Sequence, residues 1–213
     1  MSLSDTIKLR YRGRLASPDL VETLSQEVED ICRIQGWTYQ LWQEDWQQPS
    51  ELEATFEANQ LNVNGHASLR GISFCPKPAD ELVWLTFQAD GVLQSLITRL
   101  NPTFTGDEVD MPWQRIKTSI GRPESHLTVC RLLRYLGGRY FSAFEVLDES
   151  GFWKYQDEDR FHNWSRDMTA HITQLQADLA AIEADETLDP ETRHRRSMAV
   201  MKAASAHFRV AES

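Results

Sequence analysis

Two pairs of adjacent carboxylates are the residues of this chain best suited to chemistry. Glu44 and Asp45 form the first pair, Asp148 and Glu149 form the second, and each pair follows a short segment that reads as a strand. Carboxylates that crowd together bind a hard cation such as calcium or magnesium, or one of them acquires a raised pKa and acts as an acid catalyst. A divalent cation site and a site for acid-base catalysis are both compatible with these residues.

Two histidines extend this candidate site. His66 follows a tight turn, and His126 stands in the first turn of an expected helix. A histidine supplies either a nitrogen ligand or a general base. The candidate metal site therefore consists of Glu44, Asp45, Asp148, Glu149, His66 and His126. The alternative interpretation is that the carboxylates are solvated loop residues and that His126 is a surface or capping group, because no motif as specific as His-Glu-x-x-His is present.

The two carboxylate pairs meet only if two parts of the chain fold alike. Residues 7–46 and 116–153 share one order of features: a basic-edged strand, a helix that begins at a proline, a glycine stop, an aromatic strand, two carboxylates and a tryptophan. We expect Gly36 to end the first helix and Gly137-Gly138 to end the second. The segments read as two strand-helix-strand units related by a pseudo-two-fold axis, with chance similarity as the alternative because such units are common.

Strand material separates the two units. Asn64-Gly65 is a strong turn signal, and residues 69–75, 82–87 and 92–97 form three short apolar runs with turn residues between them. These runs predict a β-meander. The predicted fold class is therefore α+β, with a mostly antiparallel sheet in which two strand-helix-strand units flank the meander, followed by a C-terminal helical hairpin.

The last third of the chain has a helical pattern. Apolar residues recur at helical spacing over residues 161–182, and Thr187 to Pro190 interrupt the pattern before a second helix. We expect an α+β domain over residues 1–155 and a helical hairpin extension over residues 156–213. The apolar stripe packs either on the body of its own chain or on a second copy, and the second arrangement would make a homodimer through the C-terminal helices.

A second candidate site lies on the outer face of the expected sheet. Basic side chains alternate with apolar ones in both units, so they should point away from the helices. With one tryptophan that flanks the strands, the predicted binding face consists of Lys8, Arg10, Arg12, Arg115, Lys117 and Trp42. Such a face attracts an acidic peptide, a phosphate-bearing ligand or an acidic loop of the same chain. The alternative is that outward Lys and Arg only protect the sheet from aggregation.

Composition narrows the class of partner. The 213 residues carry 32 acidic and 22 basic side chains, for a formal charge of -10, which argues against nucleic acid or an anionic membrane as the main partner. The three cysteines are far apart in the sequence and lie in apolar runs, so we expect reduced core thiols. The basic N-terminal segment lacks the apolar run of a signal peptide, and we expect a cytoplasmic protein.

Two stretches resemble patterns in a family of uncharacterised bacterial proteins. They comprise residues 65–74 with Pro76 and Pro78, and residues 123–126 with residues 132–136 and Tyr140-Phe141. The resemblance covers roughly residues 6–155 and leaves the helical tail outside it. It implies a bacterial, cytoplasmic origin and no particular activity.

The expected function is binding without catalysis. We expect a protein that engages a protein or small-molecule partner through the basic, aromatic sheet face or through the helical tail. No phosphate-binding glycine loop and no Gly-x-Ser-x-Gly motif occurs in the sequence, and no bound cofactor is expected. The alternative is a metal-dependent or acid-base enzyme, with a divalent cation held by the clustered carboxylates and a histidine.

Overall fold

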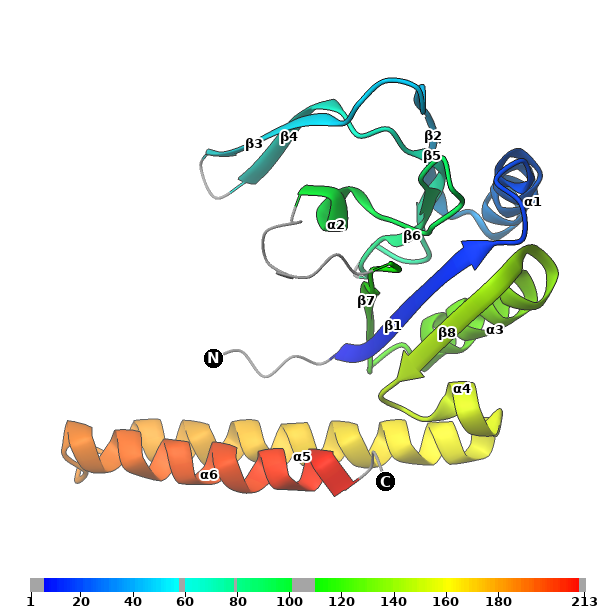
Figure 1. Cartoon of the computed structure of the whole chain (residues 1–213). Coiled ribbons are helices and arrows are strands. Elements are labelled where there is room, and N and C mark those ends of the chain that lie inside the picture. Colours follow the sequence, from blue (N-terminus) through cyan, green and yellow to red (C-terminus); the bar gives the residue numbers. More distant parts are fainter. Residues whose placement is uncertain (1–5, 58–59, 79, 101–109, 211–213) are drawn as a thin grey trace.

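The computed structural model describes residues 6–57, 60–78, 80–100 and 110–210 (Figure 1). Its chain forms an α+β body with antiparallel sheets and two long C-terminal helices that run beside the body as a hairpin. The predicted fold class is confirmed.

One strand organises the first sheet. β1 (Thr6–Leu15) lies between β7 (Gln114–Ser119) and β8 (Phe141–Asp148), and it is antiparallel to both. Burial alternates along this strand: the side chains of Ile7, Leu9 and Tyr11 are buried, whereas that of Arg10 is exposed. Cross-strand partners lie on the same face of the sheet, so the exposed residues of β1 lie beside the exposed residues of β7 and β8.

A second sheet and a hairpin lie beside the first sheet. The second sheet has the order β2-β5-β6, and the hairpin joins β3 and β4. The strands are β2 (Thr38–Gln43), β3 (Glu51–Glu57), β4 (Gln60–His66), β5 (Arg70–Cys75) and β6 (Val83–Phe87). The hydroxyl group of Tyr11 joins the sheets, because it donates to the carbonyl oxygen of Trp84 at 2.9 Å and accepts from the amide of Trp84 at 2.8 Å.

Two helices cover one side of this β layer. α1 (Leu20–Gln35) packs on the second sheet, α3 (Pro123–Tyr140) packs on the first, and the two helices contact each other (Figure 1). Gly36 ends α1 as predicted, because it adopts φ 66° while the amide of Trp37 donates to Cys32. Both helices therefore lie on the buried side of the β layer, and Arg10 of β1 and Arg115 of β7 are exposed on the other side of the first sheet.

Three local predictions are wrong. Residues 92–97 make only isolated β-bridges at Val92 and Leu93, and the short helix α2 (Leu96–Leu100) follows. Asn64-Gly65 lies inside β4 and not at a turn, since Gly65 is paired with Leu52. Gly137-Gly138 does not end α3. A Cβ atom at Gly137 would lie 2.6 Å from the ring of Phe144, so this glycine allows a close approach between helix and strand.

The first helix of the hairpin shares the core of the body. After the short helix α4 (Phe152–Tyr155), α5 (Glu158–Ala184) packs with α6 (Pro190–Val210). Phe161, Met168 and Ile172 of α5 belong to the main hydrophobic cluster, and the hydroxyl of Ser165 donates to the carbonyl oxygen of Ile120. The first half of the apolar stripe therefore packs on its own chain. Dimerisation through the tail stays a prediction.

A polar cluster fastens α1 to α3. The carboxylate of Glu27 on α1 accepts hydrogen bonds from the hydroxyls of Tyr135 and Tyr140 and lies 3.5 Å from Arg139 on α3. Partial burial opposes ionisation of Glu27, but the two hydroxyls and the positive charge outweigh it, so its pKa lies below the ordinary value. Ionised Glu27 therefore stabilises the contact between the helices.

We predict that Glu27→Gln lowers the free energy of unfolding by about 1 kcal/mol at neutral pH, because two charge-assisted hydrogen bonds weaken. A lowered pKa in the folded state contributes stability above the unfolded value of about 4.3, and this contribution is lost as the pH falls through the folded value. The free energies of unfolding of wild type and variant, measured by urea denaturation, should therefore become equal at acid pH. The control is Glu22→Gln at an exposed position on α1, where we expect a change of less than about 0.5 kcal/mol at neutral pH.

We predict that Phe161→Ala destabilises the whole chain by about 3 kcal/mol or more, because this ring is 1% exposed and its removal leaves a cavity. Met198→Ala on α6 is the matched control. Its side chain is half-exposed, and we expect less than about 1 kcal/mol. Chemical denaturation followed by circular dichroism measures both values, and equal small effects would contradict a core shared with α5.

Candidate functional site

Both carboxylates of the first predicted pair accept hydrogen bonds from backbone amides. Glu44 Oε2 accepts the amide of Leu69 at 2.9 Å, and Asp45 Oδ1 accepts the amide of Gln47 at 2.9 Å. Both carboxylates thus fix the chain where it leaves β2. His66 of β4 is the cross-strand partner of Glu51 of β3. Its Nδ1 is 3.4 Å from the carbonyl oxygen of Pro49.

The second predicted pair is split between the two sides of the sheet. Asp148 is the partner of Leu9 on the buried face, and its side chain is 1% exposed. Glu149 turns outward, where it accepts the amide of Lys8 at 3.1 Å and lies 3.8 Å from the Lys8 ammonium group. The alternation of a strand explains this division, since neighbouring residues face opposite sides.

The structure brings two of the six predicted metal-site residues together. His126 Nε2 lies 3.1 Å from Asp148 Oδ1, and both side chains are buried. Cys130, which the sequence interpretation did not include, is the third member of this group. Within the described residues, no other group of three or more His, Cys, Asp or Glu side chains has its donor atoms as close together. The spacing of four between His126 and Cys130 on one helix was the signal for this third residue.

His126 stands at the centre of a buried polar cluster. Its Nε2 lies 3.4 Å from Cys130 Sγ and 3.2 Å from Ser150 Oγ, and its Nδ1 lies 2.9 Å from Thr118 Oγ1. The ring stacks on Phe161 at a centroid distance of 5.3 Å. Strands β7 and β8 and helices α3 and α5 all contribute to the surroundings of this histidine.

Asp148 is held ionised in this cluster. Burial opposes ionisation, but the hydrogen bond and charge of His126, the amide of Trp153 and the hydroxyl of Ser150 outweigh it and lower the pKa of Asp148. The amide of Trp153 donates to Oδ2 at 2.8 Å, and the amide of Ser150 donates to Oδ1 at 2.9 Å. Burial and the neighbouring carboxylate raise the pKa of the Cys130 thiol well above its ordinary value.

The cluster does not have the geometry of a nucleophilic triad. In such a triad the nucleophile and the orienting carboxylate occupy opposite nitrogens of the histidine. Here Cys130 and Asp148 both lie at Nε2, and Thr118 lies at Nδ1. The side chains of His126 and Cys130 are fully buried, so a substrate has no access to the thiol. The arrangement therefore suits a structural contact and not acyl transfer.

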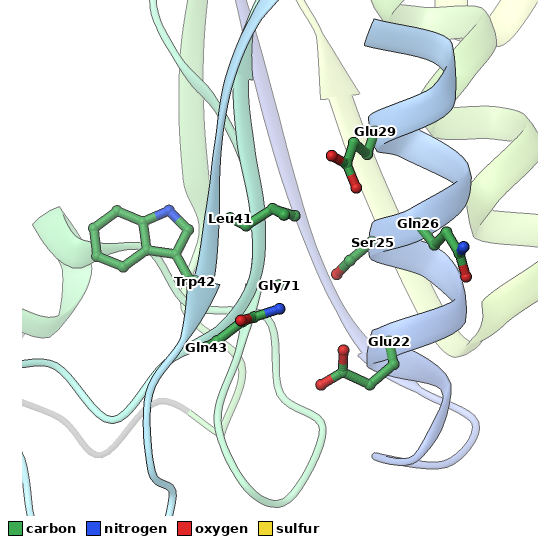
Figure 2. Close-up of a pocket in the computed structure, with 8 residues that line it drawn as sticks. All are labelled: Glu22, Ser25, Gln26, Glu29, Leu41, Trp42, Gln43 and Gly71. Carbon is green, nitrogen blue, oxygen red and sulfur yellow. The ribbon is translucent and has the colours of Figure 1, made fainter. Parts of the chain in front are cut away.

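A small groove separates α1 from β2 (Figure 2). Its volume is about 210 Å³, and its lining includes Glu22 and Glu29 of α1 and Leu41 and Gln43 of β2. Ligand pockets are usually larger, at about 300–1,000 Å³, and mostly apolar. Glu29 already accepts hydrogen bonds from Arg33 and Tyr39. We do not assign a ligand to this groove.

The basic residues of the predicted binding face do share one face. Lys8 is the cross-strand partner of Lys117, and Arg10 is the partner of Arg115. Arg12 continues the same row on β1 opposite Glu145 of β8, and Arg14, which was not predicted, extends it toward Asp90. This outer face, the cationic face below, comprises Lys8, Arg10, Arg12, Arg14, Arg115 and Lys117.

Trp42 lies on the other sheet. It belongs to β2, its Nε1 donates to Ser73 Oγ at 3.0 Å, and its ring packs against Trp84. Figure 2 shows its side chain on the side of β2 opposite α1. The aromatic residue of the cationic face is Trp113 instead, which lies directly before β7. The guanidinium groups of Arg12 and Arg10 lie 4.5 and 5.8 Å from its ring centroid.

Comparison of the chain with protein-family models, curated proteins and solved structures found no match. The resemblance noted in the sequence therefore carries no argument about activity. Within the described part of the chain, no helix combines the length and the apolar character needed to span a bilayer. Any assignment of function must come from the geometry of the chain itself.

We predict that Asp148→Asn lowers the free energy of unfolding by about 2–3 kcal/mol, because it weakens a buried network that His126, Ser150 and Trp153 share. Glu149→Gln is the adjacent control, and we expect less than about 1 kcal/mol there because this carboxylate is partly exposed. Urea denaturation measures both changes. Equal effects at the two positions would contradict the special role of the buried carboxylate.

Proposed function

We propose that the protein is a non-enzymatic binding protein whose cationic face captures an acidic segment of a protein partner. The observation that carries this proposal is the register of β1 and β7. It places Lys8 directly opposite Lys117 and Arg10 directly opposite Arg115, two successive pairs of like charge on one exposed face. Like charges in directly opposed positions destabilise a sheet. An anion bound between them would relieve this repulsion.

In the part of the chain that the structure describes, the centre of the cationic face lacks carboxylate partners. Glu149, Glu81 and Glu145 form ion pairs with Lys8, Lys117 and Arg12 around its margin. Arg10 and Arg115, by contrast, have no carboxylate partner among the described residues. Their free hydrogen-bond donors favour an anion at this position, because an arginine binds a carboxylate through two parallel hydrogen bonds.

Trp113 prepares the arginines for binding. The ring holds the guanidinium groups of Arg10 and Arg12 by cation-π contact. A guanidinium that rests on an aromatic face keeps its N–H edge free for a carboxylate, and less side-chain entropy is lost when the anion arrives.

An acidic protein segment suits this surface better than a nucleic acid or an anionic membrane. The whole chain has a formal charge of -10, which repels a nucleic acid or an anionic membrane. A short acidic segment responds mainly to charges within about 8–10 Å, the screening distance at physiological salt. It can therefore bind the local cationic face despite the overall charge.

Binding of a fluorescent peptide of alternating glutamate and glycine tests the proposal. We predict that Arg10→Glu with Arg115→Glu weakens binding at least about tenfold, or 1.4 kcal/mol, in fluorescence anisotropy. The control is Arg166→Glu with Arg195→Glu, which makes the same change in net charge at exposed positions on α5 and α6. We expect less than about a threefold loss for the control because of screening.

The neutral variant Arg10→Gln with Arg115→Gln separates binding from folding. It should lose peptide binding and keep or raise the melting temperature, because it removes a like-charge pair. Equal losses in the two charge-matched variants, or wild-type binding in the sheet variant, would refute the proposal. Stronger competition by pyrophosphate than by the unlabelled peptide would assign the face to phosphate ligands instead.

A further inference from the structure

We propose that His126, Cys130 and Asp148 form a closed structural site for a zinc ion. The three side chains converge from α3 and the end of β8, and their donor atoms all lie within 4.8 Å of one another. This site is separate from the cationic face, since Asp148 lies on the buried side of the first sheet.

The two spacings from His126 are close to those of a tetrahedral ion. With zinc bond lengths of about 2.0 Å to nitrogen or oxygen and 2.3 Å to sulfur, tetrahedral ligands lie about 3.3–3.6 Å apart. His126 Nε2 is 3.1 Å from Asp148 Oδ1 and 3.4 Å from Cys130 Sγ. Small movements of these side chains would open the space that the ion requires.

The chemistry of the donors selects the metal. A thiolate is a poor ligand for magnesium or calcium, which prefer oxygen, whereas zinc accepts sulfur, nitrogen and carboxylate oxygen together. Ser150 Oγ lies 3.2 Å from His126 Nε2 and 2.8 Å from each carboxylate oxygen of Asp148. These contacts hold the carboxylate in place, and the side chains of His126, Cys130 and Asp148 are all buried, which leaves no path for a substrate and indicates a structural ion.

Binding of the ion balances charge and protons. Zinc would displace the proton of Cys130 Sγ and bind the Nε2 lone pair of His126, so that the contact between Nε2 and Asp148 would become a bridge through the metal. Nδ1 then carries the remaining imidazole proton and donates to Thr118 Oγ1 at 2.9 Å. A thiolate and a carboxylate neutralise the two positive charges, so the buried site has no net charge.

The ion would join elements that are distant in the sequence. It would link α3 to the end of β8, next to the turn that Asp148 holds through the amides of Ser150 and Trp153. Phe161 of α5 stacks on the ligand histidine. Metal binding would therefore stabilise the attachment of the hairpin to the body.

Cobalt substitution of the full-length protein tests the site. The chain is unfolded with a reductant and a chelator, and it is then refolded with cobalt(II) in place of zinc. We expect one cobalt per chain, with the near-ultraviolet absorption of a cobalt-thiolate bond and the strong visible bands of a tetrahedral ion. Cys130→Ser should lose the thiolate absorption, whereas Cys32→Ser, the control at another buried cysteine, should retain it.

X-ray absorption of the zinc-refolded wild type provides a measurement that needs no variant. We expect one sulfur neighbour and otherwise nitrogen and oxygen neighbours. Failure of the refolded wild type to retain a metal, bound metal without a sulfur neighbour, or a thiolate absorption that persists in Cys130→Ser would each overturn the proposal.

Discussion

The alternation of β1 is the constraint on which the rest of the structure depends. This strand lies between two antiparallel neighbours, so each of its side chains must face either the core or solvent. Leu9 and Tyr11 face inward and help to anchor α1 and α3, whereas Arg10 faces outward. A shift of one residue in register would bury the cations and expose the core, and the repeated apolar positions therefore fix both faces at once.

The same rule separates two adjacent carboxylates into different environments. Asp148 ends β8 on the buried side and becomes part of a dry polar cluster, while Glu149 lies outside and pairs with Lys8. The two proposed sites thus lie on opposite sides of one thin sheet. Because the sheet has only three strands, a change at the end of β8 affects both sides.

Local patterns in the sequence predicted much of this arrangement. The alternation of β1 and β7, the proline start of α3, the glycine end of α1 and the helical tail are all local signals, and the structure contains each of them. The basic residues of the outer face followed from the same alternation. Features that depend on tertiary contact were not predicted correctly. Gly137 lies inside a helix, where the absence of a side chain lets Phe144 pack against it, and Trp42 belongs to a different sheet.

The candidate metal residues also depend on tertiary contacts that the sequence does not show. A pseudo-two-fold axis was the only reason to group Glu44 with Asp148, but β2 joins β5 and β6 while β8 joins β1. Sequence spacing could place His126 and Cys130 on one face of a helix. Only the crossover of α3 over the sheet shows that Asp148 meets them.

The seam between the two sheets has a mechanical consequence. Along it, isolated bridges at Val92 and Leu93 and the paired hydrogen bonds of the Tyr11 hydroxyl take the place of a continuous ladder. The hydrophobic core continues across this seam, since Tyr11 of β1 and Ile72 of β5 belong to one cluster. A load on one sheet therefore reaches the other mainly through side-chain packing and not through strand pairing.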